Sequence, residues 1–549
     1  MQNTLVYTAN CDGLTSTILT VESRQTKGFA GIALIGNTSE VCRDGKERAK
    51  TALEGLQIQL PANRILVSLA PADIRKDGNH FDLPIAISLA LLTIKPHAEF
   101  DLTSWVFAAE LSLSGHLRPC RGIVSIALAA AAEGISGIIV SDANLQDVLA
   151  LTRLGGEAFS NFKVFGFHRL REVLDWITDG SIPVSANIEL ISRNHSERPI
   201  PPNFDDMILT FDQKRIIQAI SIGSHSVMFS GSPGCGKSML AERIPSVLPI
   251  TTRQDHLEAL QIQSLTYASL PQSLLQGRPS FRHPHHQASA SAILGTPDTP
   301  GELSLAHGGI LFLDEFPEFR RDIIESLREP LETGQVQVSR AKHKITWSSR
   351  ILFMSARNNC PCGWYGSKKR LCSCSTQKRT KYLNRMSGPI LDRIDIHYNF
   401  PEIMKDHGAV FEALSVSNRN QTESLRLSVQ AARERSKFRN TKFNCIVNRD
   451  LPAKNIIEAS GLKDDDFSKL LKKFTKPFHS ARSIVKSLRV AITLKDLDND
   501  EYLTERHFTE AWGWQYDFAE KERGETSLDI SQTREQRRST DDSPTSDYR

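Results

Sequence analysis

Apolar and polar positions alternate with two different periods through the first 180 residues. Three runs have the length and composition of buried strands: 31–35, 64–69 and 137–140. Three segments have the spacing of apolar residues that is typical of helices: 46–56, 83–94 and 123–133. Strands that alternate with helices predict an α/β domain with its own core over residues 1–180.

A second α/β pattern runs from about residue 205 to residue 400. Apolar runs predict strands at 226–230, 310–313 and 351–356. A helix is predicted over 321–332, and the alternation of 334–347 predicts a β-hairpin with a basic tip.

The remaining segments differ in composition from these two domains. Residues 401–515 are charged and helical, with a long amphipathic stretch at 423–437, and predict a helical domain. Prolines among polar residues at 181–204 predict a linker. The polar tail 516–549 contains few apolar residues and is predicted to be disordered.

Composition limits the class of protein. The 549 residues are 40% hydrophobic and 24% charged, which is ordinary for a globular protein. A net charge of +4 means that any contact with nucleic acid must come from local basic patches. We find neither a signal peptide nor an apolar run of the ~18 residues that a membrane span needs. Four of the nine cysteines are clustered in pairs, which favours a metal site in a reducing compartment, so a cytoplasmic protein without a membrane partner is expected.

One motif dominates the second domain. It matches G-x-x-x-x-G-K-[ST] and lies between a predicted strand and the helix that begins near Met239, which is the context of a phosphate-binding loop. In such a loop the backbone N–H groups hold phosphates, the lysine reaches the β- and γ-phosphates, and the hydroxyl ligates Mg²⁺. The sequence therefore predicts an ATP and Mg²⁺ site at Gly231, Ser232, Pro233, Gly234, Cys235, Gly236, Lys237 and Ser238.

Two carboxylates end the apolar strand 310–313. Unpaired carboxylates at the end of a buried strand are costly unless they meet a partner, here a metal and a water. We expect Asp314 to hold Mg²⁺ through water and Glu315 to orient and polarise the attacking water.

Three further segments contain candidate ligand-binding residues, and each of them has two interpretations. The histidines of 283–286 either ligate a metal or belong to a structural or substrate-contacting loop; the intervening proline disfavours a helical metal pair. In the hairpin, Arg340, Lys342 and Lys344 either form a solvated tip or contact nucleic-acid phosphates without reading bases. Cys360, Cys362, Cys372 and Cys374 either bind Zn²⁺ or form a reduced, metal-free cluster, and the basic residues around them suit nucleic acid.

Motifs in the first and in the second α/β domain resemble those of the ComM (YifB) family of magnesium-chelatase-like ATPases. The resemblance rests on residues 69–78, 81–86 and 356–363 and extends over about residues 1–515. It implies an N-terminal domain with the fold of the Lon proteolytic domain, then an AAA+ P-loop core with a helical lid. His80 or Asp82 stands where Lon proteases have a serine, and Val124 where they have a lysine, so a structural or assembly role is predicted instead of proteolysis.

The resemblance also implies roles for three polar residues. Asn358 falls at the family's sensor-1 asparagine, beside two departures from the family pattern at Arg357 and Asn359. Arg393 matches the arginine finger that enters a neighbouring subunit's ATP site. Arg482 matches the sensor-2 arginine, which would touch the γ-phosphate.

The function that the resemblance implies is that of a hexameric AAA+ ATPase acting on DNA, a helicase that drives branch migration during natural transformation. The alternative is a chelatase-type ATPase that remodels a protein or inserts a metal into a cofactor. A third hypothesis, a scaffold gated by ATP without hydrolysis, is disfavoured by the intact Glu315.

Overall fold

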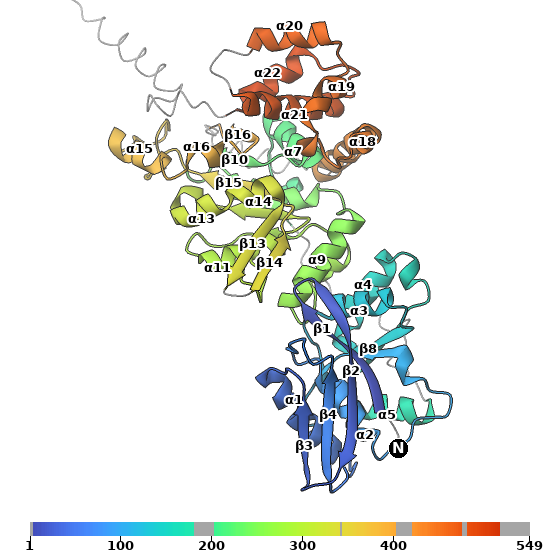
Figure 1. Cartoon of the computed structure of the whole chain (residues 1–549). Helices are drawn as coiled ribbons and strands as arrows, with labels where there is room; N and C mark the ends of the chain where they lie inside the picture. Colours follow the sequence, from blue (N-terminus) through green and yellow to red (C-terminus); the bar gives the residue numbers. More distant parts are fainter. Residues whose placement is uncertain (1–3, 181–201, 341–342, 402–419, 475–479, 516–549) are drawn as a thin grey trace, which may run out of the picture.

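The computed structural model describes residues 4–180, 202–340, 343–401, 420–474 and 480–515. It confirms the predicted α/β class: an N-terminal domain, a central domain and a helical lid follow one another along the chain (Figure 1). Most of the predicted linker and all of the predicted tail lie outside the described residues. Phe204, which was predicted to belong to the linker, is fully buried in the core of the central domain.

A seven-stranded mixed sheet organises the N-terminal domain, in the order β3-β4-β2-β1-β5-β8-β9. The strands are β1 Thr4–Asp12, β2 Thr15–Thr26, β3 Gly31–Ile35, β4 Arg64–Ala70, β5 Trp105–Phe107, β8 Gly137–Ser141 and β9 Lys163–Phe167, with β6 Glu110–Leu111 and β7 Leu117–Arg118 in a separate small hairpin. The helices are α1 Glu40–Gly55, α2 Asp82–Ala90, α3 Ile123–Ala132, α4 Leu145–Leu154 and α5 Leu170–Asp179. Side chains of β4 alternate between buried and less buried positions, as expected of a strand with two unlike faces.

The central domain is built on a five-stranded parallel sheet, in the order β11-β12-β15-β10-β16. Its strands are β10 Val227–Ser230, β11 Phe281–Arg282, β12 Ile310–Leu313, β15 Leu352–Arg357 and β16 Ile396–Asn399. β10 and β12 are buried along their whole length, as in sheets covered on both faces. Because all five strands are parallel, their carboxyl ends lie on the same side of the sheet, which we call the carboxyl edge. Their amino ends lie on the opposite side, the amino edge.

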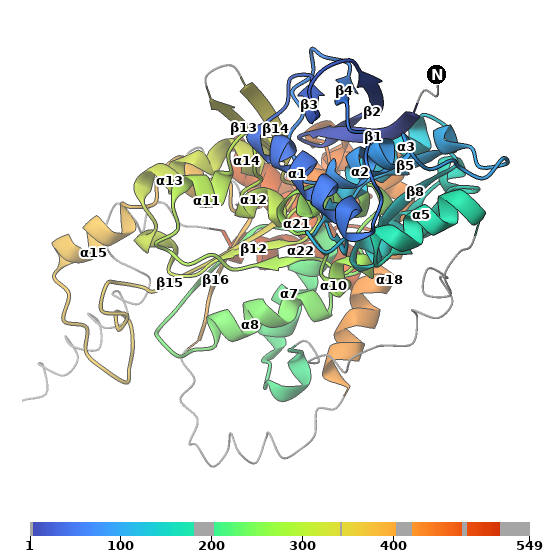
Figure 2. The same ribbon diagram turned by 90° about the horizontal axis from the view of Figure 1, so that it is seen from below.

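Short helices surround this sheet: α7 Phe211–Gly223, α8 Lys237–Arg243, α9 Arg253–Thr266, α10 Gln272–Leu275, α11 Ala290–Leu294, α12 Glu302–Leu305, α13 Arg321–Ser326, α14 Arg328–Thr333, α15 Thr376–Leu383 and α16 Gly388–Leu391. The predicted helix 321–332 is divided into α13 and α14. Pro330 has no N–H with which to continue the helical ladder, which accounts for the break. Figures 1 and 2 both show α15 at the end of the central domain that lies away from the N-terminal domain.

The predicted hairpin is present as β13 Gln335–Arg340 and β14 His343–Ser348, which pair antiparallel. Trp347 and Val336 near its base are buried in the core that also covers β12. The tip, residues 341–342, lies outside the described residues.

The lid consists of α18 Gln421–Lys442, α19 Ile456–Ser460, α20 Asp464–Phe474, α21 Ala481–Asp498 and α22 Glu505–Gly513. Arg215 of α7 fixes it to the central domain, because its guanidinium donates to Asp498 at the end of α21 and to Glu510 of α22. The Arg215 side chain is only 7% exposed, so this ion-pair network is largely shielded from water.

Helix α9 joins the N-terminal domain to the central domain. Its apolar residues Ala259 and Leu260 are buried in the same cluster as residues of α3 and α4. Gln261 donates to the carbonyl of Leu14 in the β1–β2 turn, at 3.1 Å, and the Leu270 N–H donates to Asp147. In the described part of the chain, no helix is both long enough and apolar enough to cross a membrane.

Candidate nucleotide-binding site

The phosphate-binding motif lies at the carboxyl edge of the central sheet. Residues 231–236 form a loop between the buried strand β10 and helix α8. Gly231, Gly234 and Gly236 have φ of 152°, 74° and 93°, values that favour glycine. A Cβ on Gly231 would lie 3.0 Å from the side chains of Cys235 and Phe400, so the loop is also closely packed. The residues present therefore fit a nucleotide phosphate chain at the start of α8.

The hydroxyl of this motif faces the strand that carries the two carboxylates. Ser238 donates to Asp314 at 2.5 Å, which brings one hydroxyl and one carboxylate to the same point. Mg²⁺ binds proteins through one or two oxygens of this kind and keeps several waters. These two side chains therefore fit the metal that the sequence predicted for them.

Lys237 and Asn358 also meet at this edge. The ammonium of Lys237 donates to the carbonyls of Gly231 and Ser232, at 2.9 and 3.0 Å, and to Asn358 Oδ1, at 3.2 Å. β15 pairs with both β10 and β12, so its carboxyl end lies between the phosphate-binding loop and the two carboxylates. An amide at this position can sense a phosphate held by Lys237.

Glu315 has an unusual backbone and an unexpected partner. Its φ of 51° and ψ of 41° are left-handed, a conformation that is uncommon for residues other than glycine. One carboxylate oxygen lies 3.2 Å from Nδ1 of His286, and the Glu315 side chain is 51% exposed. The carboxylate thus projects into solvent beside the phosphate-binding loop, with a histidine at its side.

The two arginines implied by the family resemblance lie together, away from this loop. Arg393 and Arg482 each donate to the carboxylate of Glu332, at 2.5 and 2.7 Å. Arg482 also pairs with Asp392 at 3.3 Å. Lys486 lies 3.9 Å from the same Asp392, so the cluster contains three cations and two carboxylates and retains one positive charge for a further anion.

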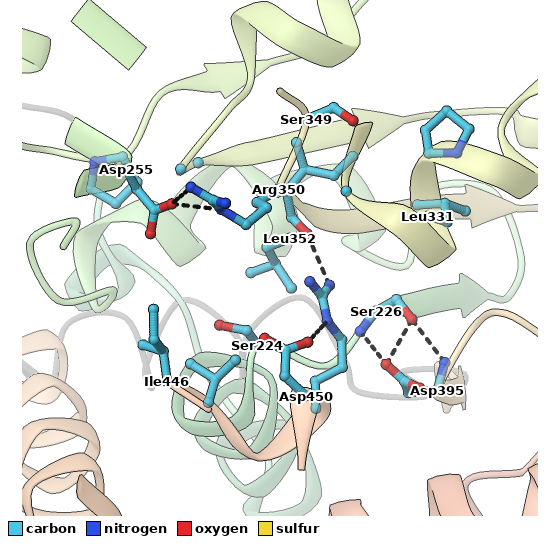
Figure 3. A pocket seen from close by; sticks show the side chains of 18 of the residues that line it. Ser224, Ser226, Asp255, Leu331, Ser349, Arg350, Leu352, Asp395, Ile446 and Asp450 are labelled. Carbon is cyan, nitrogen blue, oxygen red and sulfur yellow. Dashed lines mark hydrogen bonds and ion pairs between the residues drawn. The ribbon is translucent and has the colours of Figure 1, made fainter. Parts of the chain in front are cut away.

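These arginines line a cavity of about 650 Å³ at the amino edge of the central sheet. Ser226 directly precedes β10, Asp395 directly precedes β16, and the two are hydrogen bonded in one wall of the cavity (Figure 3). The phosphate-binding loop follows the other end of β10. Four strand residues span roughly 13 Å, so Arg393 and Arg482 lie a full strand length from the loop of their own chain.

The four cysteines come together as predicted. Their sulfur atoms all lie within 4.8 Å of one another. Backbone N–H groups of Tyr365 and Cys374 point at the sulfurs of Cys360 and Cys372, at 3.3 and 3.4 Å, which stabilises thiolates. Burial opposes ionisation of Cys362, but backbone hydrogen bonds lower its pKa to about 6. Four thiols in this arrangement fit tetrahedral Zn²⁺.

The basic hairpin is described only in part. Lys344 is exposed near the tip, and the backbone of Arg340 pairs with that of His343. Lys342 and the Arg340 side chain lie outside the described residues. The hairpin exposes Lys344 to solvent, and contact of all three residues with a phosphate backbone stays a prediction.

The residues at the Lon-like positions have internal partners. His80 is 3% exposed with Nε2 2.8 Å from the carbonyl of Ala9, and burial lowers its pKa to about 4. Asp82 is fully buried and accepts two hydrogen bonds from Arg48, at 2.6 and 2.9 Å. Val124 is fully buried in α3.

Two contacts of the site were not predicted from the sequence: His286 lies beside Glu315, and Glu332 joins the two arginines. The histidine-rich segment follows β11, and β11 pairs with β12, so His286 emerges next to Glu315. That pairing was the missing information, since the strand Phe281–Arg282 has only two residues and no clear pattern. Glu332 carries no motif at all.

Comparisons with known proteins identify the family of the chain. Sequence profiles described as magnesium chelatase, subunit ChlI, match residues 203–407; the subunit's C-terminal profile matches residues 419–515, and a third profile, subunit ChlI of Mg-chelatase, matches residues 21–144.

Full-length relatives show the same relationship. The chain is 33% identical to competence protein ComM of Haemophilus influenzae over 519 residues, which are 94% of this chain and 97% of that protein. It is also 33% identical to the protein YifB of Escherichia coli over 523 residues, covering 93% and 96% of the two chains. A Lon protease of Chloroherpeton thalassium matches 33% of this chain at 25% identity, over 22% of its own length. The chain therefore belongs to the ComM (YifB) family of magnesium-chelatase-like AAA+ ATPases, with a Lon-protease-like N-terminal domain.

Proposed function

We propose that this protein is an ATP-driven DNA motor, a branch-migration helicase that acts in natural transformation or recombination. One observation supports the motor function. The phosphate-binding loop lies at the carboxyl ends of the strands of the central sheet, whereas Arg393 and Arg482 lie at their amino ends. Each chain thus holds two halves of an ATPase site that cannot meet within it. A ring, for which we propose a hexamer, brings the halves together.

In this ring the loop N–H groups and Lys237 bind the phosphates of ATP, and Ser238 and Asp314 hold Mg²⁺. The metal neutralises charge that develops on the phosphates during transfer. Glu315 orients and polarises the attacking water, and Asn358, already bonded to Lys237, senses the γ-phosphate.

Arg393 supplies positive charge to the ATP of the neighbouring subunit, as the family resemblance implies. Arg482 lies beside it, so we propose that this arginine also reaches the neighbour's γ-phosphate and not that of its own chain. Glu332 releases both guanidinium groups when a phosphate replaces it, because a phosphate carries more charge and accepts more hydrogen bonds.

The proposal that the substrate is DNA has two supports. The hairpin β13–β14 carries basic residues, with Lys344 exposed, and a full-length relative is named a competence protein. The alternative, a chelatase-type ATPase that remodels a protein or inserts a metal, is favoured by the family descriptions that match the chain.

Turnover with and without branched DNA separates these two functions. We expect a synthetic four-way junction to stimulate ATP hydrolysis by purified protein and to be migrated when ATP is present. Lys237→Ala protein controls for contaminating ATPases. A rate of ATP hydrolysis that is unchanged by single-stranded and branched DNA would overturn the proposed DNA motor and leave the chelatase-type function.

We also propose one Zn²⁺ per chain at the cysteine cluster. Elemental analysis of reduced, chelator-free protein should find one zinc, and Cys360→Ser protein should have lost it. Cys445→Ser, at a cysteine outside the cluster, is the matched control and should retain the metal. Wild-type protein without stoichiometric metal would contradict this assignment.

A further inference from the structure

The segment Cys360–Arg385, which we call the cysteine module, carries charge of one sign only. It comprises the loop with the four clustered cysteines and helix α15, and its 26 residues include no aspartate or glutamate. Its seven cations are Lys368, Lys369, Arg370, Lys378, Arg379, Lys381 and Arg385. The whole chain has a net charge of only +4, so this module is a concentrated basic patch.

Several of these cations are held in defined positions. Arg379 lies 4.2 Å from the ring centre of Tyr365 and donates to the carbonyl of Cys374. Arg370 lies 5.7 Å from the ring of Trp364. The aromatic rings and the cysteine cluster thus fix the path of a loop that would otherwise have little apolar core.

The module also presents free charge to solvent. Lys369, Lys378 and Lys381 are exposed, and among the residues that the structure describes none of them forms an ion pair. Leu371, beside Arg370 at the surface, is 92% exposed. In both Figure 1 and Figure 2, α15 lies apart from the β13–β14 hairpin, so this basic surface is separate from the hairpin.

The module is attached directly to the nucleotide site. Asn358, which accepts from Lys237, lies two residues before Cys360. Gly363 has a φ of 83°, and a Cβ there would lie only 2.4 Å from Cγ of Pro233 in the phosphate-binding loop. Because the two loops are packed this closely, a displacement of one must move the other.

We propose that the cysteine module is a second nucleic-acid-binding surface, which contacts the sugar–phosphate backbone and transmits this contact to the phosphate-binding loop. The inference rests on the proposed function, since it assigns a further contact to the same substrate. We favour a phosphate backbone over an acidic protein surface. The unpaired lysines and the arginines beside the aromatic rings can contact successive phosphates along a strand, and such contacts do not require a partner of complementary shape. The contact is therefore independent of base sequence.

The test compares two triple variants of the full-length protein. Lys369→Ala/Lys378→Ala/Lys381→Ala removes module charge, and Lys454→Ala/Lys463→Ala/Lys472→Ala removes equal charge from exposed lysines of the lid. Binding to fluorescent single-stranded DNA is measured by anisotropy over a range of salt concentrations. Each lost phosphate contact lowers the slope of log affinity against log salt by ~0.7, so the module variant should lose up to ~2 units and bind at least ~10-fold more weakly.

The lid variant should bind like wild type, and both variants should contain as much zinc as wild type, which shows that the module is folded. Wild-type affinity and slope in the module variant would overturn the inference while leaving the proposed function intact. Wild-type protein that binds no DNA would instead overturn the proposed function, and the inference with it. Loss of binding to polyglutamate but not to DNA would identify an acidic protein as the partner and overturn the inference.

Gly363→Ala tests the connection to the nucleotide site. This variant retains every cation, so we expect it to bind DNA like wild type while the ratio of ATP turnover with saturating DNA to turnover without it falls towards one. A wild-type ratio in Gly363→Ala would show that the module binds DNA without transmitting the contact, and would overturn that half of the proposal.

Discussion

In the N-terminal domain, the positions that the family resemblance aligns with the serine and lysine of Lon proteases are occupied by buried side chains whose polar groups have partners within the fold. His80 is bonded to a backbone carbonyl, Asp82 to Arg48, and Val124 is apolar. In the central domain, Ser238 and Asp314 are partly exposed and Glu315 is exposed at the sheet edge. A bound ligand can replace the contacts that these three side chains make.

This difference shows what a reactive site requires of a shared α/β architecture. A polar group performs chemistry when it lies at a sheet edge with unused hydrogen-bonding capacity, and it stabilises the fold when its capacity is consumed by the fold itself. Substitutions should therefore have opposite signatures in the two domains: lost turnover in the central domain and lost stability in the N-terminal domain.

The largest effect is expected at the phosphate-binding edge. Lys237→Ala should abolish ATP binding, whereas Glu315→Gln should bind ATP and hydrolyse it about 10²–10⁴-fold more slowly, because only the activation of water is lost. Equilibrium binding and turnover are measured for both proteins. Asp298→Asn, at an exposed carboxylate of the same domain, should behave like wild type. Hydrolysis by Glu315→Gln at the wild-type rate would remove Glu315 from the site.

A comparable loss is expected from the amino edge of the same sheet. Arg393→Ala should bind ATP almost normally and hydrolyse it ~10³-fold more slowly, even with DNA. The decisive experiment mixes Arg393→Ala subunits with Lys237→Ala subunits, since each supplies what the other lacks. Mixed rings should regain part of the activity. If mixed rings form and remain inactive, Arg393 does not act on the neighbouring subunit.

The sequence predicted the carboxyl edge of the central sheet well and its amino edge poorly. The loop 231–238 and the pair Asp314 and Glu315 follow short buried strands, so local pattern and motif agree with the structure. The position of Arg482 depends on how the lid docks, which Arg215 determines through contacts almost 300 residues away in the chain. No local pattern encodes such a contact. The same holds for His286, whose neighbour is set by strand pairing.

In the N-terminal domain the effect should fall on stability. Arg48→Ala leaves the buried carboxylate of Asp82 without its cation, and breaking a buried pair typically costs about 3–5 kcal/mol. We expect a loss of about 3 kcal/mol, since Asp82 keeps the Leu111 N–H and burial already raises its pKa, so that it can take up a proton. Denaturant unfolding followed in this domain measures the change.

Arg43→Ala is the matched control for this variant. It removes an exposed arginine from the same helix, α1, and should cost little. Neither variant should gain or lose peptidase activity, because we expect the wild type to have none. ATP-dependent cleavage of an unfolded substrate by wild-type protein would contradict the contrast drawn between the two domains.

The smallest effect concerns His80, which occupies one candidate position of the Lon serine. Burial lowers its pKa from the ordinary 6.5 to about 4, although the hydrogen bond to the Ala9 carbonyl and the charge of Asp77 act in the opposite direction. The folded domain therefore binds fewer protons than the unfolded chain between these two values. It follows that stability contributed by neutral His80 is fully present above about pH 6.5 and is lost as the pH falls towards 4.

The slope of this loss is at most about 1.4 kcal/mol per pH unit. His80→Gln keeps an amide N–H that can donate to the carbonyl of Ala9 but has no group that titrates in this range. The difference in unfolding free energy between wild type and His80→Gln should thus shift in favour of the variant as the pH is lowered from 7 to 5. Hydrogen exchange of β1 amides in the full-length protein reports on this domain specifically. Parallel pH profiles for the two proteins would mean that His80 is accessible and charged in the folded domain, and that this position is closer to a reactive site than the buried hydrogen bond implies.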